Sequence, residues 1–158
     1  MIIYIIVTSE KVGRARMYSK LGKQGEWKFV PTYKMTVRFK KKILTFAVTR
    51  DTVTQIFKIG DHRECPASTH RQPFHAWVRE DNNRGFRLQL CESLAENPNT
   101  LIGRGTKIRS FIQIHRGPSK SLGCLAVAGG KKTYKEFEDT LKKFLKKSKD
   151  IRVTVQQR

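Results

Sequence analysis

Short apolar runs separated by polar turns make up most of the chain, a pattern typical of β-strands. Met35, Val37 and Phe39 alternate with polar residues, which is the period of a strand with one buried face. Runs of this kind predict short strands along the whole chain, at residues 2–7, 17–18, 27–30, 35–39, 43–48, 52–59, 74–78, 86–90, 107–114, 125–127 and 151–155.

Turn-forming residues lie between these runs. Residues 21–25 and 81–85 are rich in glycine and polar residues, and they predict two hairpin turns. Residues 61–73 and 96–105 predict two longer loops. In the strand predicted at 107–114, Ile108, Ile112 and Ile114 share one parity. We therefore expect that face to be buried.

One helix is predicted near the end of the chain. Apolar residues recur there at helical spacing, with lysines on the opposite face: Tyr134, Phe137, Leu141, Phe144 and Leu145. The T-x-x-E pattern at 133–136 predicts a capping box at the start of this helix. The apolar stripe is interpreted as core. The expected fold class is mostly β (α+β), as one domain over residues 1–158 with this helix and a closing strand.

The chain is strongly basic. Its 33 Lys and Arg residues against 13 Asp and Glu give a formal charge of +20, which attracts polyanions. The basic residues are spread over the whole chain, and aromatic residues do not interleave with the basic runs as a base-stacking surface requires. No specific nucleic acid is therefore favoured as a partner. No apolar run approaches about 20 residues, which argues against a membrane span.

The three cysteines suggest no metal site. Cys91 follows an alternating apolar run and is expected to be buried. His62 and Cys65 form an isolated H-x-x-C, and the cysteine spacing matches no common zinc-ribbon pattern. We expect neither a metal nor a cofactor. The start of the chain, residues 1–7, has no basic segment before it and no small-residue cleavage site after it, so it predicts a strand rather than a signal peptide.

Residues 112–125 carry the chemistry that stands out. A predicted strand ends at His115, a loop of small residues follows, and Ser121, Gly123 and Cys124 form a Ser-x-Gly-Cys sequence. A thiol becomes a good nucleophile when an imidazole accepts its proton. A neighbouring glycine leaves room for a substrate carbonyl, and Ser121 is placed to cap the loop or to donate a hydrogen bond. The alternative is a strand-end histidine and a cysteine that only packs in the core.

This segment resembles the catalytic end of the L,D-transpeptidase (YkuD-type) family, which carries His-Gly and then Ser-His-Gly-Cys, followed by a helix and a final strand. The matching residues are His115, Gly117 (one position late), Ser121, Gly123 and Cys124. The resemblance covers about the last 50 residues. Two positions depart from it: the middle histidine of the motif is Leu122 here, and the basic residue two positions after the cysteine is Ala126.

The resemblance implies an L,D-transpeptidase-like β-sandwich or barrel and an enzyme that acts on peptidoglycan stem peptides. Cys124 would be the nucleophile and His115 the general base, with backbone amides near Gly123 stabilising the oxyanion. Gly117 would contact substrate, and Arg116 would either hold a substrate carboxylate or be only an exposed charge. The acyl group would pass to an amine, a D-amino acid or water. Three residues are candidates for orienting His115: His70, His75 and Ser119.

Compact variants with a Ser-x-Gly-Cys ending resemble secreted antibacterial effectors and phage-associated wall enzymes. This comparison implies action in the periplasm or cell wall, delivery by a secretion system, and a secretion apparatus or an immunity protein as further partners. Two other functions stay open. One is a non-catalytic basic module that binds nucleic acid or a cell-wall polymer, and the other is a structural phage or secretion component.

A catalytic Cys124 is expected to have a pKa below about 8.5, the value of an ordinary thiol.

Overall fold

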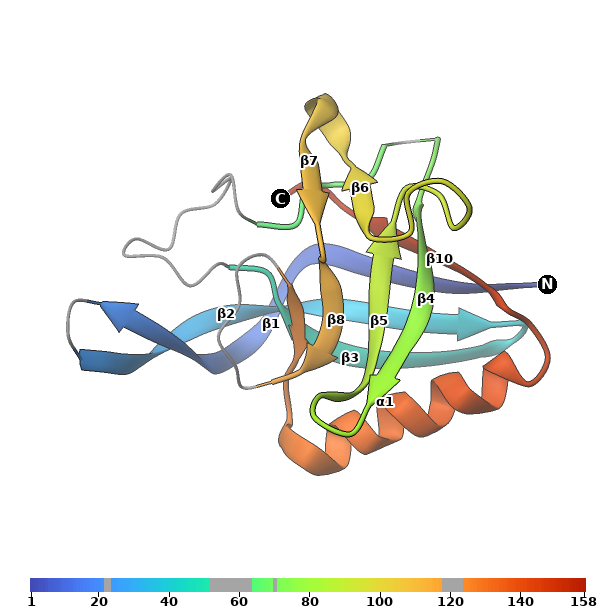
Figure 1. The fold of residues 1–158 in the computed structure, drawn as a ribbon. Helices are drawn as coiled ribbons and strands as arrows, with labels where there is room; N and C mark the ends of the chain where they lie inside the picture. Colours follow the sequence, from blue (N-terminus) through green and yellow to red (C-terminus); the bar gives the residue numbers. More distant parts are fainter. Residues whose placement is uncertain (22–23, 52–63, 70, 118–123) are drawn as a thin grey trace.

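The computed structural model describes residues 1–21, 24–51, 64–69, 71–117 and 124–158. Within these residues, eight strands close into a barrel in the order β1-β10-β4-β5-β8-β9-β3-β2 (Figure 1). The barrel strands are β1 (Ile2–Leu21), β2 (Gln24–Phe39), β3 (Lys42–Thr49), β4 (Phe74–Asp81), β5 (Gly85–Cys91), β8 (Gln113–Arg116), β9 (Leu125–Val127) and β10 (Asp150–Val155). The prediction of a mostly β fold with one helix is confirmed at this level.

The two ends of the chain meet in the barrel wall. β10 pairs with β1 in parallel, from Ile2↔Asp150 to Val7↔Val155. Alternate residues of both strands face the core and are buried: Ile3, Ile5, Val7, Ile151, Val153 and Val155. The predicted closing strand is therefore confirmed, and it contributes to the core directly.

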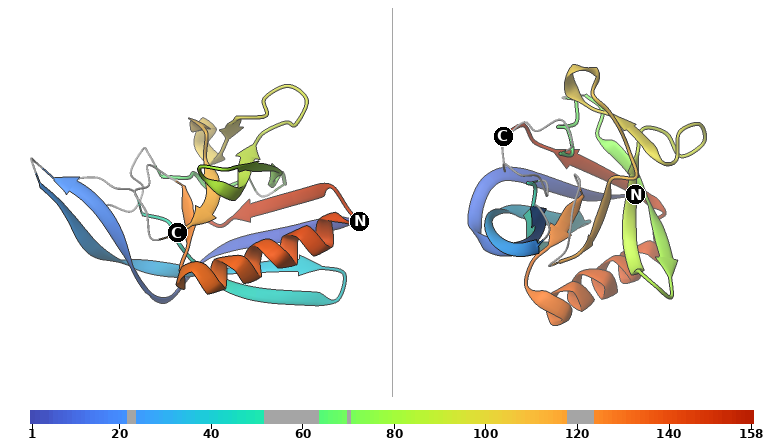
Figure 2. Two further views of the ribbon diagram at one scale, coloured as in Figure 1. Left: turned by 60° about the horizontal axis from the view of Figure 1, so that its bottom comes forward. Right: turned by 60° about the vertical axis from the view of Figure 1, so that its left-hand side comes forward.

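The β1–β2 hairpin extends well beyond the barrel (Figures 1 and 2). β1 pairs with β10 only as far as Val7, and β2 pairs with β3 only from Thr32 onward. Residues 14–21 and 24–31 pair only with each other among the described strands, and we call this segment the ribbon. The pairing of Leu21 with Gln24 confirms the predicted hairpin, whose residues 22–23 lie outside the described part.

Helix α1 (Gly130–Leu145) packs along one side of the barrel (Figure 2). The predicted apolar stripe is confirmed, because Tyr134, Phe137, Leu141 and Phe144 are all buried. Leu145 is partly buried against the same core. The Phe137 ring meets Phe46 of β3 edge-on, with 5.4 Å between the ring centroids.

The predicted capping box is wrong. The helix begins at Gly130, after Gly129 at φ 104°, and no side chain caps its N-terminus. Thr133 instead lies inside the first turn, where its side chain packs against Gly129. A Cβ at Gly129 would lie 2.6 Å from the Thr133 hydroxyl, so both the positive φ and the lack of space require glycine there.

Replacing Phe137 with alanine should destabilise the fold by about 3–5 kcal/mol, because the side chain is fully buried and its removal leaves a cavity between helix and barrel. The free energy of unfolding in urea measures this effect. Lys135→Ala, on the exposed face of the same helix, is the matched control and should change stability by less than about 0.5 kcal/mol. A loss below about 1 kcal/mol for Phe137→Ala would contradict the packing described here.

The region 96–114 differs from the prediction. The expected loop contains β6 (Thr100–Ile102), which pairs with β7 (Ile108–Ser110) outside the barrel, with the short helix η1 (Arg104–Thr106) between them. Phe111, at φ 58°, ends β7 before β8 begins. The single strand predicted at 107–114 is therefore two strands, and Ile108 is 64% exposed rather than buried.

Two other predictions fall wholly or partly outside the described residues. The strand at 52–59 lies outside them entirely, and the described residues of the loop at 61–73 form neither helix nor strand. The hairpin turn at 81–85 is confirmed by the pairing of Asp81 with Gly85. Within the part of the chain that the structure describes, no helix is both long and apolar enough to cross a membrane.

Candidate active site

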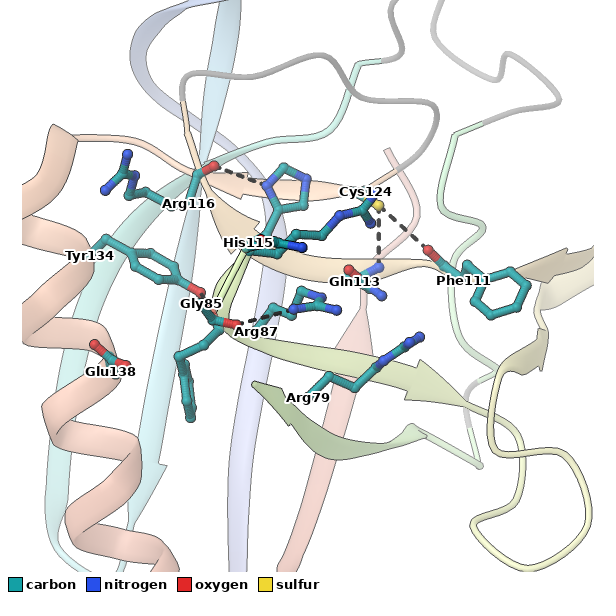
Figure 3. A pocket seen from close by; sticks show the side chains of 13 residues that line it. Arg79, Gly85, Arg87, Phe111, Gln113, His115, Arg116, Cys124, Tyr134 and Glu138 are labelled. Carbon is teal, nitrogen blue, oxygen red and sulfur yellow. Dashed lines mark hydrogen bonds between the residues drawn. The ribbon is translucent and has the colours of Figure 1, made fainter. Parts of the chain in front are cut away.

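Neighbouring strands bring His115 and Cys124 to one cavity. β8 and β9 run in parallel with His115 opposite Ala126, and Cys124 directly precedes β9. Continuing that register places Cys124 beside Gln113, two residues before His115. Both side chains line a cavity of about 750 Å³, and Figure 3 shows the ring and the sulfur along the same wall.

The Cys124 thiol is half-buried and contacts two backbone groups. The N–H of Gln113 donates to Sγ at 3.4 Å, and the thiol donates to the Phe111 carbonyl at 3.6 Å (Figure 3). Burial raises the pKa of this thiol above its ordinary value, which outweighs the opposing effect of the Gln113 N–H. The expectation of a lowered pKa is therefore wrong: the resting sulfur is protonated at neutral pH.

His115 stands at the end of β8 as a neutral imidazole. Burial lowers its pKa below the ordinary value, and the nearby charges of Arg84 and Arg87 act in the same direction. Its Nδ1 lies 3.0 Å from the carbonyl oxygen of Arg116. A carbonyl can only accept a hydrogen bond, so Nδ1 carries the proton and Nε2 keeps its lone pair.

The group that orients His115 is thus the Arg116 backbone carbonyl. Sequence reasoning missed it, because every residue has a carbonyl and none is distinguished by the pattern. Of the three candidates, His75 lines a different cavity, while His70 and Ser119 lie outside the described residues.

A neutral imidazole and a protonated thiol have the protonation states that general base catalysis requires. His115 Nε2 is free of the hydrogen bond that Nδ1 makes, and it can take the thiol proton as the sulfur attacks an electrophile. A preformed thiolate–imidazolium pair would need the opposite pKa shifts.

Alkylation of Cys124 by iodoacetamide should consequently be slow at neutral pH. A pKa above the ordinary thiol value of about 8.5 leaves little thiolate at neutral pH, so the rate should keep rising with pH beyond that value. Mass spectrometry of the labelled peptide gives the rate for each cysteine. A rate that levels off below pH 8 would show a stabilised thiolate and contradict the protonated resting state.

The cavity is lined by four arginines, which come from β4, the β4–β5 turn, β5 and β8: Arg79, Arg84, Arg87 and Arg116. Arg87 is buried, binds Asp81 at 2.9 Å, and donates to the Gly85 carbonyl at 3.1 Å. Its Nε is buried and has no hydrogen-bond partner among the described residues. The acidic residue that lines the cavity, Glu138, is paired with Lys142 at 3.2 Å. The cavity therefore favours an anionic ligand.

Sequence reasoning singled out only Arg116 of these cations. Arg79, Arg84 and Arg87 belong to the β4–β5 hairpin, far from Cys124 in the sequence, and only the pairing of β5 with β8 brings them to the site. No local motif marks them. Their basic character does not distinguish them either, because the chain has a charge of +20 and many other cations are spread along it.

A buried amide pair fixes the floor of the cavity. Gln113 donates from Nε2 to the Gln89 side chain at 3.0 Å, and Gln89 donates to the Ile112 carbonyl at 3.3 Å. Arg79 donates to the same Gln89 oxygen at 3.2 Å. Buried and mutually satisfied polar groups hold strands in one register, so β5 and β8 form a rigid support for Cys124.

The remaining predicted residues are placed differently. Gly117 is buried and lines a second cavity rather than the one that holds Cys124. Its N–H donates to the Val127 carbonyl at 3.0 Å, and a Cβ there would lie 3.1 Å from that oxygen. Close packing of the backbone therefore explains the glycine at this position, and substrate contact does not. Ser121 and Gly123 lie outside the described residues.

Cys65 and Cys91 are buried thiols and line neither cavity near β8. The burial predicted for Cys91 is confirmed, and burial raises its pKa to about 11. Among the described residues, no group of three or more His, Cys, Asp or Glu side chains could hold a metal ion. His62 of the H-x-x-C pattern lies outside that part.

No family model, curated protein or solved structure matches the chain. Function is therefore inferred from the geometry of this site together with the sequence around it.

Proposed function

We propose that the protein is a cysteine acyltransferase that acts on peptidoglycan stem tetrapeptides, as an L,D-transpeptidase, a D-amino acid exchange enzyme or an L,D-carboxypeptidase. One observation supports this above all: the Cys124 thiol and the His115 ring, whose Nδ1 contacts a backbone carbonyl, line the same cationic cavity. The Ser-x-Gly-Cys sequence, the helix and the closing strand support the L,D-transpeptidase resemblance, for which the mostly β barrel is the proposed fold.

The first half-reaction forms a thioester. His115 Nε2 takes the thiol proton while the Cys124 sulfur attacks the carbonyl of the third stem residue, giving a tetrahedral oxyanion. The proposed donors to that oxyanion are the backbone amides around Gly123 and Cys124. The intermediate collapses as the carbon–nitrogen bond breaks. The imidazolium returns its proton to the leaving amine of D-alanine.

The second half-reaction releases the acyl group. An amine, a D-amino acid or water attacks the thioester, and His115 takes the proton that the nucleophile loses. The bond to sulfur breaks, and the proton returns to the thiolate. The products are a 3→3 cross-link, an exchanged stem or a tripeptide, respectively. The resting protonated thiol is restored in all three cases.

The arginines supply the attraction for such a substrate. A stem tetrapeptide carries carboxylates at its C-terminus and on its acidic residues, and guanidinium groups bind carboxylates through two parallel hydrogen bonds. Arg84 and Arg116 are exposed at the cavity. No ion pair is recorded for either side chain among the described residues. They are the proposed carboxylate contacts, in a protein that acts in the periplasm or cell wall.

The second candidate is a basic binding module without chemistry, and the raised pKa of Cys124 favours it. Chromatography and mass spectrometry of a purified disaccharide tetrapeptide, incubated with the protein and a D-amino acid, separate the two functions. The enzyme should release D-alanine and form tripeptide, exchanged stem or cross-linked dimer. Bound but unchanged muropeptide would identify the binding module.

A further inference from the structure

The ribbon carries a row of cations and aromatic rings on one face. Arg16 pairs with Phe29 and Tyr18 with Trp27 across the two strands, so these side chains share a face with Arg14. The guanidinium of Arg14 lies 5.5 Å from the Phe29 ring centroid, and that of Arg16 lies 5.2 Å from the Trp27 ring. Aromatic residues were not expected to interleave with the basic runs along the chain, and here they meet arginines across two paired strands instead.

This face is open to solvent. Phe29 is 61% exposed and Trp27 is 48% exposed. Large apolar side chains grouped at the surface mark interaction sites, and cation–π contacts hold each guanidinium extended beside a ring. The ribbon therefore offers preorganised cations next to flat apolar surfaces, which suits a polymer with rings and negative charges.

A second cavity lies at the base of the ribbon. It has a volume of about 270 Å³, and it is lined by Arg14, Arg16 and Phe29 together with Thr49 of β3. The Thr49 hydroxyl oxygen is buried and has no hydrogen-bond partner among the described residues. Because that oxygen has almost no accessible surface, the polar side chains that a ligand in this cavity can reach are those of Arg14 and Arg16.

The same cavity reaches the strands of the active site. Gly117 and Ala126 line it, and each adjoins a residue of the β8–β9 pair that positions His115 and Cys124. Arg116, next to Gly117, lines the cavity of the thiol. A single extended ligand thus has contacts available at both places.

We propose that the ribbon and the cavity at its base bind the glycan strand of peptidoglycan. Sugar rings of the strand beyond the reacting disaccharide present apolar C–H faces to Phe29 and Trp27, and carboxylates of neighbouring stems can meet Arg14 and Arg16. This inference rests on the proposed function, because the glycan strand carries the stem peptides that the Cys124 site takes. Single-stranded nucleic acid shares the rings and the charge but would occupy the ribbon alone.

Cosedimentation with purified insoluble sacculi tests the proposal. The ribbon variant is Arg14→Gln/Arg16→Gln/Phe29→Ser, which alters only exposed or partly exposed side chains. The matched control is Lys146→Gln/Lys147→Gln/Ile43→Ser, which removes the same charge and an apolar residue that is 62% exposed. The ribbon variant should bind sacculi about tenfold more weakly, while the control stays within about twofold of wild type.

Three further readouts separate the outcomes. Turnover of a soluble disaccharide tetrapeptide and the urea midpoint should match wild type in both variants, which shows that the site and fold are intact. Equal cosedimentation of all three proteins would overturn the proposal. So would ribbon-dependent binding of a single-stranded oligonucleotide that is tighter than binding of sacculi. Ribbon-dependent binding of sacculi without any turnover would support this inference while the proposed acyltransferase fails.

Discussion

Cys124→Ala should abolish conversion of the tetrapeptide muropeptide, with a rate loss of at least about 10⁴-fold. The reason is that no other described thiol lines the cavity, so no group can form the acyl-enzyme. The thermal midpoint should hardly change. The sulfur is half-buried, and its contacts with the Gln113 N–H and the Phe111 carbonyl are long, at 3.4 Å and 3.6 Å.

Cys91→Ala is the matched control for this substitution. Cys91 is fully buried in β5 and does not line the cavity, so its variant should keep wild-type turnover and lose about 1 kcal/mol of stability. The two substitutions should therefore have opposite profiles. Cys124→Ala should lose activity but not stability, and Cys91→Ala should lose stability but not activity. Unaltered turnover by Cys124→Ala would exclude the proposed mechanism.

His115→Gln should lower kcat/KM by about 10²–10⁴-fold, which is the usual contribution of a positioned general base. The dependence of the rate on pH gives a more specific test of His115 than the size of the rate loss. In the wild type the neutral imidazole is the active form, and its pKa is lowered by burial, so the rate should rise through a pKa below 6.5 and then level off. In the variant that inflection should disappear, and the rate should instead rise with ionisation of the thiol, above its ordinary pKa of about 8.5.

His75→Gln is the control for the histidine, because His75 lines a separate cavity beside Arg71 and Arg152. It should leave both the rate and the pH profile unchanged. An inflection below pH 6.5 that persists in His115→Gln would assign it to another group. It would then remove His115 from the proposed role.

The sequence was sufficient to predict an element where apolar residues recur with the regular spacing of a helix or a strand. The helical spacing from Tyr134 to Leu145 and the alternation from Ile151 to Val155 predicted elements that the structure confirms. Prediction from the sequence failed where the backbone departs locally from regular helix or strand geometry. The positive φ of Phe111 divides one predicted strand, and the left-handed Gly129 starts the helix before the predicted cap. Such local departures have no signature in an apolar–polar pattern.

The site divides in the same way. His115 and Cys124 could be singled out from the chain, because a strand-end histidine and a Gly-Cys sequence have recognisable chemistry. The pKa directions could not, since they depend on burial that only the barrel creates. The positions of the Arg87 guanidinium and of the aromatic rings of the ribbon could not be predicted either. They depend on pairing between strands, which brings together residues that no local sequence pattern connects.

Intact-mass spectrometry of the protein mixed with a tetrapeptide donor tests the nucleophile most directly. The protein should gain the mass of the donor minus D-alanine, and peptide mapping should place this adduct on Cys124. Hydroxylamine should remove the adduct, as it does for a thioester. A donor that is consumed without any Cys124 adduct, or an adduct on Cys65 or Cys91 instead, would contradict the role of Cys124.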